Sequence, residues 1–138
     1  MTKEVGADGS IRYYNSDGDF HREDGPAIIQ ANGGQEWWLN GKLHREDGPA
    51  VIDADGGQEW WLNSKRHRSD GPAFIDTYGQ TEWFLNGKLH REDGPAVTRR
   101  DGMKEWWLNG NRSVFESYVN KLYPNDCPEK TMFFLKWG

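Results

Sequence analysis

The chain has 138 residues and a formal net charge of −5, and this length fits a single domain. The acidic balance argues against binding to nucleic acid or to anionic lipid, because phosphates are bound by clustered basic residues. No run approaches the roughly 18 apolar residues of a membrane-spanning helix, and the N-terminus, MTKEVGADGS, lacks the apolar core of a secretory signal. Cys127 is the only cysteine, so no internal disulfide can form, and we expect a cytoplasmic protein.

Residues 1–20 are predicted to form a degenerate copy of a hairpin that recurs later in the chain. Asp8-Gly9 marks a turn, and Tyr13 and Tyr14 stand where the later copies carry an aromatic pair. One residue is inserted before His21 relative to the later spacing. We expect this hairpin to form the first unit of a repeat array, whose ends must differ from its middle.

Residues 21–112 consist of four consecutive units of 23 residues. The heptapeptide HREDGPA stands at 21–27, 44–50 and 90–96, and HRSDGPA stands at 67–73. A second marker keeps the same period, with EWWLN at 36–40, 59–63 and 105–109 and EWFLN at 82–86. Such strict self-similarity is typical of an array in which each unit packs on its neighbours.

Each unit is predicted to contain two strands, because short β-favouring runs alternate with turn pairs and no stretch has helical spacing. We expect two-residue turns at Asn32-Gly33, Asp55-Gly56, Tyr78-Gly79 and Asp101-Gly102. A second set of turns is expected at Asn40-Gly41, Asn63-Ser64, Asn86-Gly87 and Asn109-Gly110. The predicted fold is mainly β, a single-layer antiparallel meander of about five hairpins with a C-terminal helix-containing cap.

Two-residue turns also predict which side chains share a face of the sheet. Counting outward from Asp55-Gly56 pairs Val51 with Trp60 and Ala50 with Trp61. The predicted core face carries Ile28, Val51, Phe74 and Val97, Trp37, Trp60, Trp83 and Trp106, and Leu39, Leu62, Leu85 and Leu108. The predicted amphipathic face carries Trp38, Trp61, Phe84 and Trp107, Glu36, Glu59, Glu82 and Glu105, Ala27, Ala50, Ala73 and Ala96, and Ile29, Ile52, Ile75 and Thr98.

Residues 113–138 lie outside the repeat and are predicted to cap it. Ser113 and Glu116 have the spacing of a capping box, and the apolar spacing that follows predicts a helix that ends before Pro124. TMFFLKW, residues 131–137, is interpreted as a last strand or a hydrophobic lid. We expect this helix-and-strand segment to cover the last hairpin of the same chain, with burial against a second copy as the competing outcome.

The unit EWWLNGKLHREDGPAVI resembles MORN-type repeats, and more closely the variant MORN-like repeats of bacterial, phage and large-virus proteins. The resemblance covers about residues 2–112 and rests on the length of 23, the aromatic pair before Asn-Gly and the Gly-containing hairpin. It implies an elongated, curved, single-layer sheet that contacts partners, with no family-wide catalytic residues. An adaptor, inhibitor or antitoxin-like role in a phage or bacterium is the expectation at the level of fold.

The repeated histidines and acids suggest a metal site at first sight, but their spacing argues against one. Equivalent residues of neighbouring units should lie about 10 Å apart, whereas histidines that share a zinc ion must bring their nitrogens within about 4 Å. We therefore expect a structural corner and no metal or other cofactor. The residues of this corner are His21, His44, His67 and His90 with Asp24, Asp47, Asp70 and Asp93.

An active site is also not expected. Catalysis normally uses one asymmetric set of residues in one pocket, whereas every candidate in the repeat is copied four times. Cys127 lies in the loop YPNDCPEK, and no histidine outside the repeats could act as its base. We expect no catalytic residues in this chain.

The leading hypothesis is therefore a non-enzymatic interaction module that binds another protein. The predicted binding residues are the aromatic and acidic rows Trp38, Trp61, Phe84 and Trp107 with Glu36, Glu59, Glu82 and Glu105, because amphipathic rings at a surface often anchor interfaces. The alternative is a small-molecule or carbohydrate binder that uses the Trp ladder. Two further alternatives are kept. The same rings pack only within the chain, or the protein is a homodimer rather than a monomer.

Overall fold

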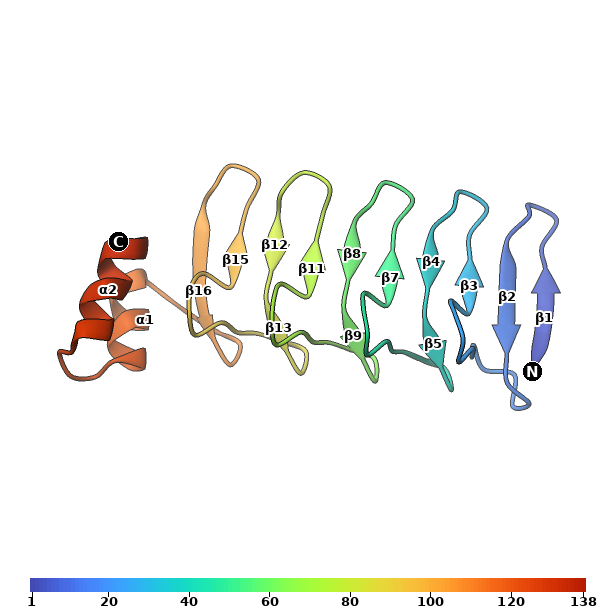
Figure 1. Cartoon of the computed structure of the whole chain (residues 1–138), viewed down its shortest axis with the longest axis horizontal. Helices are drawn as coiled ribbons and strands as arrows, with labels where there is room; N and C mark the ends of the chain where they lie inside the picture. Colours follow the sequence, from blue (N-terminus) through green and yellow to red (C-terminus); the bar gives the residue numbers. More distant parts are fainter.

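The computed structural model describes all residues, 1–138, as a mainly β protein. Successive antiparallel hairpins stand side by side in one layer, and two helices lie at the C-terminal end (Figure 1). The sheet is open, because its first and last strands do not pair with each other. The predicted fold class, a mainly β single-layer antiparallel meander with a helix-containing cap, is confirmed.

Five long hairpins form the body of the sheet. Their strands are β1 (Thr2–Val5) with β2 (Ile11–Tyr14), β3 (Ile28–Ile29) with β4 (Gln35–Glu36), β7 (Val51–Ile52) with β8 (Gln58–Glu59), β11 (Phe74–Ile75) with β12 (Thr81–Glu82), and β15 (Val97–Thr98) with β16 (Lys104–Leu108). The last four long hairpins each continue into a short hairpin, at the end of the sheet opposite the long-hairpin loops. These are β5 (Trp38–Leu39) with β6 (Lys42–Leu43), β9 (Trp61–Leu62) with β10 (Lys65–Arg66), β13 (Phe84–Leu85) with β14 (Lys88–Leu89), and the end of β16 with β17 (Asn111–Ser113).

Backbone hydrogen bonds join each unit to the next at both ends of the hairpins. In the body of the sheet, Glu36 of one unit lies opposite Val51 of the next. At the short hairpins, one turn residue donates its N–H to a carbonyl of the preceding unit over 2.8–2.9 Å. The bonded pairs are Gly41 with Phe20, Ser64 with Leu43, Gly87 with Arg66, and Gly110 with Leu89. The 23-residue period therefore corresponds to one period of backbone pairing.

The short hairpins have the predicted two-residue turns. Trp38 lies opposite Leu43 and Leu39 opposite Lys42, which leaves Asn40 and Gly41 as the turn. Both turn residues have positive φ, 48° and 77°, as a type I′ turn requires. The other three turns, at residues 63–64, 86–87 and 109–110, share this conformation.

The long hairpins do not have the predicted two-residue turns. Val51 pairs with Glu59, and the Asp53 N–H donates to the Gly57 carbonyl over 2.9 Å, so the loop contains three residues, 54–56. Only Gly56 of this loop has positive φ, 96°, which is typical of a type I turn followed by one left-handed glycine. An Asp-Gly or Asn-Gly pair suits both loop types, and the sequence pattern alone did not separate them.

The additional loop residue changes the predicted faces, because a one-residue shift in register moves every side chain of a strand relative to its partner. Val51 shares a face with Glu59 rather than with Trp60, and Ala50 shares the opposite face with Trp60. The predicted core face is therefore wrong in its composition. We call the face that carries Glu36, Glu59, Glu82 and Glu105 with Trp38, Trp61, Phe84 and Trp107 the ladder face, and the face that carries Ala27, Ala50, Ala73 and Ala96 with Trp37, Trp60, Trp83 and Trp106 the corner face.

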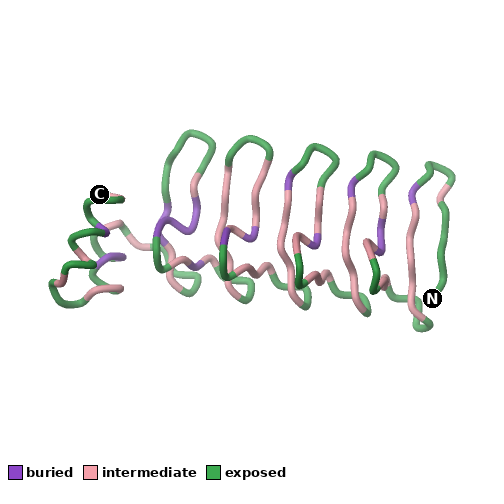
Figure 2. The backbone as a smooth tube through the Cα atoms, viewed as in Figure 1, coloured by how far each residue is buried: buried purple, intermediate pink, exposed green.

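In the array most buried residues lie on the corner face, and in the cap only Tyr118, Val119 and Phe133 are buried. The hairpin loops are exposed (Figure 2). The four alanines of the corner face are fully buried, although only 18 of the 138 residues are buried in total. A conventional core between two layers is therefore absent from the array. Its stability must come from contacts between neighbouring units within one layer.

The N-terminal hairpin follows the prediction of a degenerate first unit. β1 pairs with β2, and Tyr13 and Tyr14 occupy the positions of the later aromatic pairs. The inserted residue lengthens the lower turn, since Asn15 donates its N–H to the Asp19 carbonyl and Gly18 has a φ of 85°. This turn therefore has three residues, 16–18, where later units have two.

The C-terminal cap consists of two helices, α1 (Phe115–Leu122) and α2 (Pro128–Trp137). The predicted end of the first helix before Pro124 is confirmed, but the interpretation of residues 131–137 as a strand is wrong, because this segment forms most of α2. The capping box is also wrong: Val114 is the N-cap, and the Ser113 hydroxyl accepts a hydrogen bond from Lys121 instead. Neither helix has the length and apolar character needed to cross a bilayer.

The cap packs on the last hairpin of its own chain, as predicted. Tyr118, Val119 and Phe133 form a buried cluster with Trp106 of β16, which is 7% exposed. Partly buried residues around this cluster include Leu108, Phe115, Leu122, Tyr123 and Trp137. An aromatic ring of the array that would otherwise face water is thereby covered.

The turn at Asn63-Ser64 allows the left-handed backbone conformation of the short turns to be tested. Ser64 has a φ of 63°, in the left-handed region that is strained for residues with a Cβ, and the other units have glycine there. We predict that Ser64→Gly raises the free energy of unfolding by about 0.5–1 kcal/mol, measured by urea denaturation. Ser69→Gly is the matched control, and it should leave stability unchanged or slightly reduced because Ser69 has no positive φ. A loss of stability in Ser64→Gly would contradict the turn assignment.

Candidate functional site

The heptapeptide HREDGPA forms a corner loop between the short hairpin of one unit and the long hairpin of the next. Its first two residues bond to both neighbours, since the His44 N–H donates to the Trp37 carbonyl and the Arg45 N–H donates to the Trp61 carbonyl, each over 3.1 Å. The corner thus fills the space between two successive strands and ties the units together.

Each corner histidine holds the turn that lies 19 residues later. The His44 Nδ1 atom accepts a hydrogen bond from the backbone N–H of Asn63 over 3.0 Å. An Nδ1 atom that accepts a bond carries no proton, so this imidazole has its proton on Nε2. The other pairs are His21 with Asn40, His67 with Asn86 and His90 with Asn109, at 2.9–3.0 Å.

Each corner arginine makes three kinds of contact. Arg45 bonds through Nε to Asp47 over 2.9 Å and through a terminal nitrogen to the Pro49 carbonyl over 3.0 Å. Its guanidinium carbon also lies 3.9 Å from the ring centroid of Trp37, a cation–π stack. Equivalent stacks are Arg22 on Tyr13, Arg68 on Trp60 and Arg91 on Trp83, at 3.9–4.2 Å.

In the corner, the basic side chains are mostly buried and the acidic side chains are exposed. The Arg45 side chain is 23% exposed and that of His44 is 13% exposed, whereas Glu46 and Asp47 are 83% and 86% exposed. The hydrogen bond and the charge of Arg45 hold the pKa of Asp47 below its ordinary value. A motif that is nearly balanced in sequence therefore presents mostly carboxylates to solvent.

The corner side chains are engaged within the chain and do not gather around a common point. The Nε2 atom of His44 lies 3.4 Å from a carboxylate oxygen of Glu46, while Asp47 bonds Arg45. No three His, Cys, Asp or Glu side chains lie close enough together to bind a metal ion. The corner therefore has contacts that fix the backbone of adjacent units.

The predicted binding residues lie together on the ladder face, but their acids are not free. The indole Nε1–H of each tryptophan donates to the glutamate two residues earlier: Trp38 to Glu36, Trp61 to Glu59 and Trp107 to Glu105, at 3.1–3.3 Å. In the third unit, where Phe84 has no donor, Glu82 accepts from the Gln80 amide over 3.0 Å. These acids orient the rings rather than forming an open acidic surface.

Arginine side chains also pair with the glutamates of the ladder face. Arg66 bonds Glu59 over 2.8 Å, and its guanidinium lies 5.2–5.4 Å from the rings of Trp61, Phe74 and Phe84. At the last unit, burial by itself would raise the pKa of Glu105. Hydrogen bonds from Trp107 and Arg99 and the nearby charge of Arg112 outweigh burial, so the pKa of Glu105 lies below its ordinary value.

Sequence reasoning did not include every member of the ladder face. The residues opposite the second aromatic of each unit are Leu43, Arg66, Leu89 and Arg112. They alternate with the aromatic residues across the sheet, and Tyr14 and Phe20 extend the row, stacked at 5.2 Å between ring centroids. The two-residue turns, which were predicted correctly, contained the signal for this row, because they fix which residues lie opposite each other.

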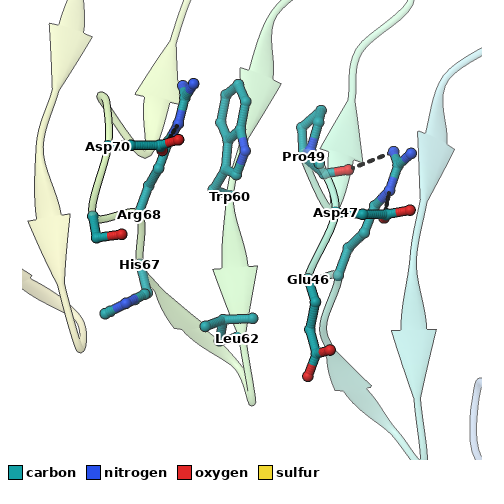
Figure 3. Close-up of a pocket in the computed structure, with 11 residues that line it drawn as sticks. Glu46, Asp47, Pro49, Trp60, Leu62, His67, Arg68 and Asp70 are labelled. Atoms are coloured by element: carbon teal, nitrogen blue, oxygen red, sulfur yellow. Dashed lines mark hydrogen bonds and ion pairs between the residues drawn. The ribbon is translucent and has the colours of Figure 1, made fainter.

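The corner face contains three open grooves, which sequence reasoning missed. They have volumes of about 760, 570 and 330 Å³ and recur between successive corner loops. In the middle groove the Trp60 ring stands between Arg68 and Pro49, with Leu62 beside the rim residue Glu46 (Figure 3). The incorrect register hid these grooves, because it paired Trp60 with Val51 and not with Ala50, which directly follows the corner residue Pro49.

The fourth corner has no open groove of this kind, because the cap occupies its place. The Tyr118 hydroxyl bonds the Gly94 carbonyl over 3.0 Å and also contacts the Arg91 carbonyl. Trp137 lies 5.7 Å from the Arg91 guanidinium and 6.0 Å from the ring of Trp106. The helices thus place aromatic side chains against Trp106, where the next corner arginine covers the equivalent ring in the three earlier units.

Comparison of the chain with protein-family models and with curated proteins found no match.

The cap contact predicts a dependence of stability on alkaline pH. Burial raises the pKa of Tyr118 from 10.0 to about 12, so the folded protein keeps the phenol neutral where the unfolded chain ionises it. The free energy of unfolding should therefore fall as pH rises from 10 towards 12, by about 1.4 kcal/mol per pH unit from this group. Urea denaturation of the intact chain and of Tyr118→Phe at pH 8 to 11.5 checks it. The stability difference between the two should shrink with rising pH, and a constant difference would contradict a buried phenol.

Proposed function

We propose that the chain is a non-enzymatic interaction module that binds another protein through the ladder face. The observation that supports this most directly is the open side of a single-layer sheet. The helices pack on β16 at the C-terminal end, and no second sheet or helix packs along the row of Trp38, Trp61 and Phe84 (Figure 1). A row of aromatic residues that alternates with Leu43, Arg66 and Leu89 and has no covering layer is the kind of surface that partners bind.

The geometry of the row suits recognition by protein side chains. The rings are half-buried against their neighbours, and the Glu–Trp and Glu–Arg pairs fix their orientation before a partner arrives. Preorganised aromatic side chains lose little conformational entropy on binding, which favours affinity. The paired acids imply that apolar contact provides most of the binding energy on this face.

The resemblance to variant MORN-like repeats agrees with this proposal, because that class uses its sheets for contacts with partners. We include membership of that class, and an adaptor, inhibitor or antitoxin-like role in a bacterium or phage, in the proposal. This part of the proposal rests on fold and repeat pattern, whereas the choice of the ladder face rests on the residues of this chain.

Site-specific photo-crosslinking tests the proposed face. Replacing Phe84 with p-benzoylphenylalanine keeps an aromatic ring on the ladder face, and the same replacement at Tyr78, which is 67% exposed in a hairpin loop, is the matched control. In lysate of the native host, we expect one saturable protein adduct at position 84 that is absent at position 78. Trp61→Ala in the same chain should remove most of this adduct.

The proposal would be contradicted by equal adducts at both positions, or by an adduct at position 84 that survives Trp61→Ala in a chain that remains folded by circular dichroism. The absence of any adduct at position 84, while the intact chain still retains a partner from the same lysate, would place binding on another face.

A further inference from the structure

The glutamates of the ladder face are neutralised by arginine in alternate units. In the second unit, Glu59 accepts hydrogen bonds from the Trp61 indole and from Arg66. The fourth unit has the same arrangement around Glu105, whose carboxylate pairs with two arginines, Arg99 and Arg112. In these two units the chain itself therefore supplies the cation that a half-buried or buried carboxylate favours.

The first and third units have the same carboxylates without a cation. Leu43 and Leu89 stand opposite the second aromatic residue, where the other two units have arginine. Glu36 accepts hydrogen bonds only from two neutral groups, an indole and an amide, and Glu82 accepts only one, from an amide. Both side chains are half-buried. Each of these carboxylates can therefore accept a further, charged donor.

The place that the guanidinium takes in the second unit is not filled by leucine. The Arg66 guanidinium lies 5.3 Å from the ring of Trp61 in its own unit and 5.4 Å from that of Phe84 in the next. Leucine ends at its Cδ atoms, so it lies between the rings without reaching the carboxylate. The ring pairs at the two leucines are, by the repeat, Trp38 with Trp61 and Phe84 with Trp107.

We propose that the partner of the ladder face supplies the two missing arginines from one extended segment. This inference rests on the proposed function of the ladder face and names the chemistry of its partner. One arginine pairs with Glu36 above Leu43, and the other pairs with Glu82 above Leu89. Arginine suits this place better than lysine, because a flat guanidinium can bond a carboxylate and stack on a ring at the same time.

The spacing of the two sites defines the segment further. They lie two units apart, which is four strands or about 19 Å. Residues i and i+6 of an extended segment are about 20 Å apart and point to the same side. Residues i+2 and i+4 then face the middle of the row, where the ring of Trp61 favours an apolar residue and the charge of Arg66 repels a cation. Apolar contact provides most of the contact area, and the two ion pairs fix the register.

A defined peptide tests this site on the intact chain. The probe is a fluorescein-labelled peptide with arginine at its first and seventh positions, valine at the odd positions between them and threonine at the even ones. We expect it to bind about tenfold more tightly than the same peptide with citrulline for arginine, which has the same shape without the charge, measured by fluorescence anisotropy. Moving the second arginine to the sixth position puts the two on opposite sides of an extended peptide, and this should weaken binding to a similar extent.

Variants of the chain locate the arginine sites. Leu89→Arg supplies the cation from within the chain, as Arg66 does in the second unit, so it should leave the fold intact and weaken peptide binding several-fold. Asn120→Arg, at an exposed position of α1, is the matched control and should have little effect. Glu82→Gln, which keeps a hydrogen-bond acceptor but loses the charge, should weaken binding several-fold more than Glu116→Gln on the exposed side of α1. Circular dichroism checks that each variant is folded.

The proposal would be overturned by equal affinity of the arginine and citrulline peptides, by equal affinity of the two arginine spacings, or by no binding of either. An equal effect of Leu89→Arg and Asn120→Arg in folded chains would overturn it as well. An adduct at position 84 together with equal binding of the arginine and citrulline peptides would mean that the ladder face binds a partner of different chemistry, so only this inference would fail. Adducts of equal yield at positions 84 and 78 would count against the proposed function itself.

Discussion

The stack of a corner arginine on a tryptophan of the preceding hairpin is the interaction on which the array depends. A single-layer sheet cannot bury one face against a second layer, and burial in this array is confined mainly to the corner face. The arginine supplies an aliphatic stem and a flat cation that cover a ring, and its hydrogen bonds to Asp47 and Pro49 hold it in that position. Each unit thus covers the ring of the previous one, and the cap does so for Trp106.

The composition of the heptapeptide follows from this stack. The histidine bonds the turn that follows, and the aspartate and the proline carbonyl bind the arginine. A Cβ on Gly71 would come within 2.7 Å of the Arg68 guanidinium, so glycine at this position leaves room for that side chain to lie against the loop. Ala73 is fully buried on the same face, where a larger residue has no room. Structural requirements therefore account for most of the repeated motif.

The sequence predicted the period, the number of hairpins, the short turns and the cap, because each of these follows from a local pattern that recurs. It did not predict the three-residue loops, since Asp55-Gly56 suits two kinds of loop that differ by one residue. That residue decides whether Val51 or Ala50 shares a face with Trp60, so the grooves were missed together with the register. The apolar segment 131–137 forms a helix that packs on Phe115 and Trp106, a tertiary contact that its β-favouring composition does not reveal.

The two faces of the sheet have different chemistry as a result. On the ladder face, acids and arginines are paired among aromatic rings, whereas on the corner face the bases are covered and the carboxylates line grooves. Both surfaces require the units to keep a fixed spacing, and the arginine stacks provide it.

A double-mutant cycle on Arg68 and Trp60 tests this account most directly. Their guanidinium and ring centroid lie 3.9 Å apart, away from the cap and from the chain ends. The free energy of unfolding would be measured by urea denaturation for the intact chain, Arg68→Met, Trp60→Leu and the double variant. We expect a coupling free energy of about 1–2 kcal/mol, because either single change removes the stack. Additive effects, with a coupling within about 0.3 kcal/mol of zero, would contradict the claim that this contact holds the units together.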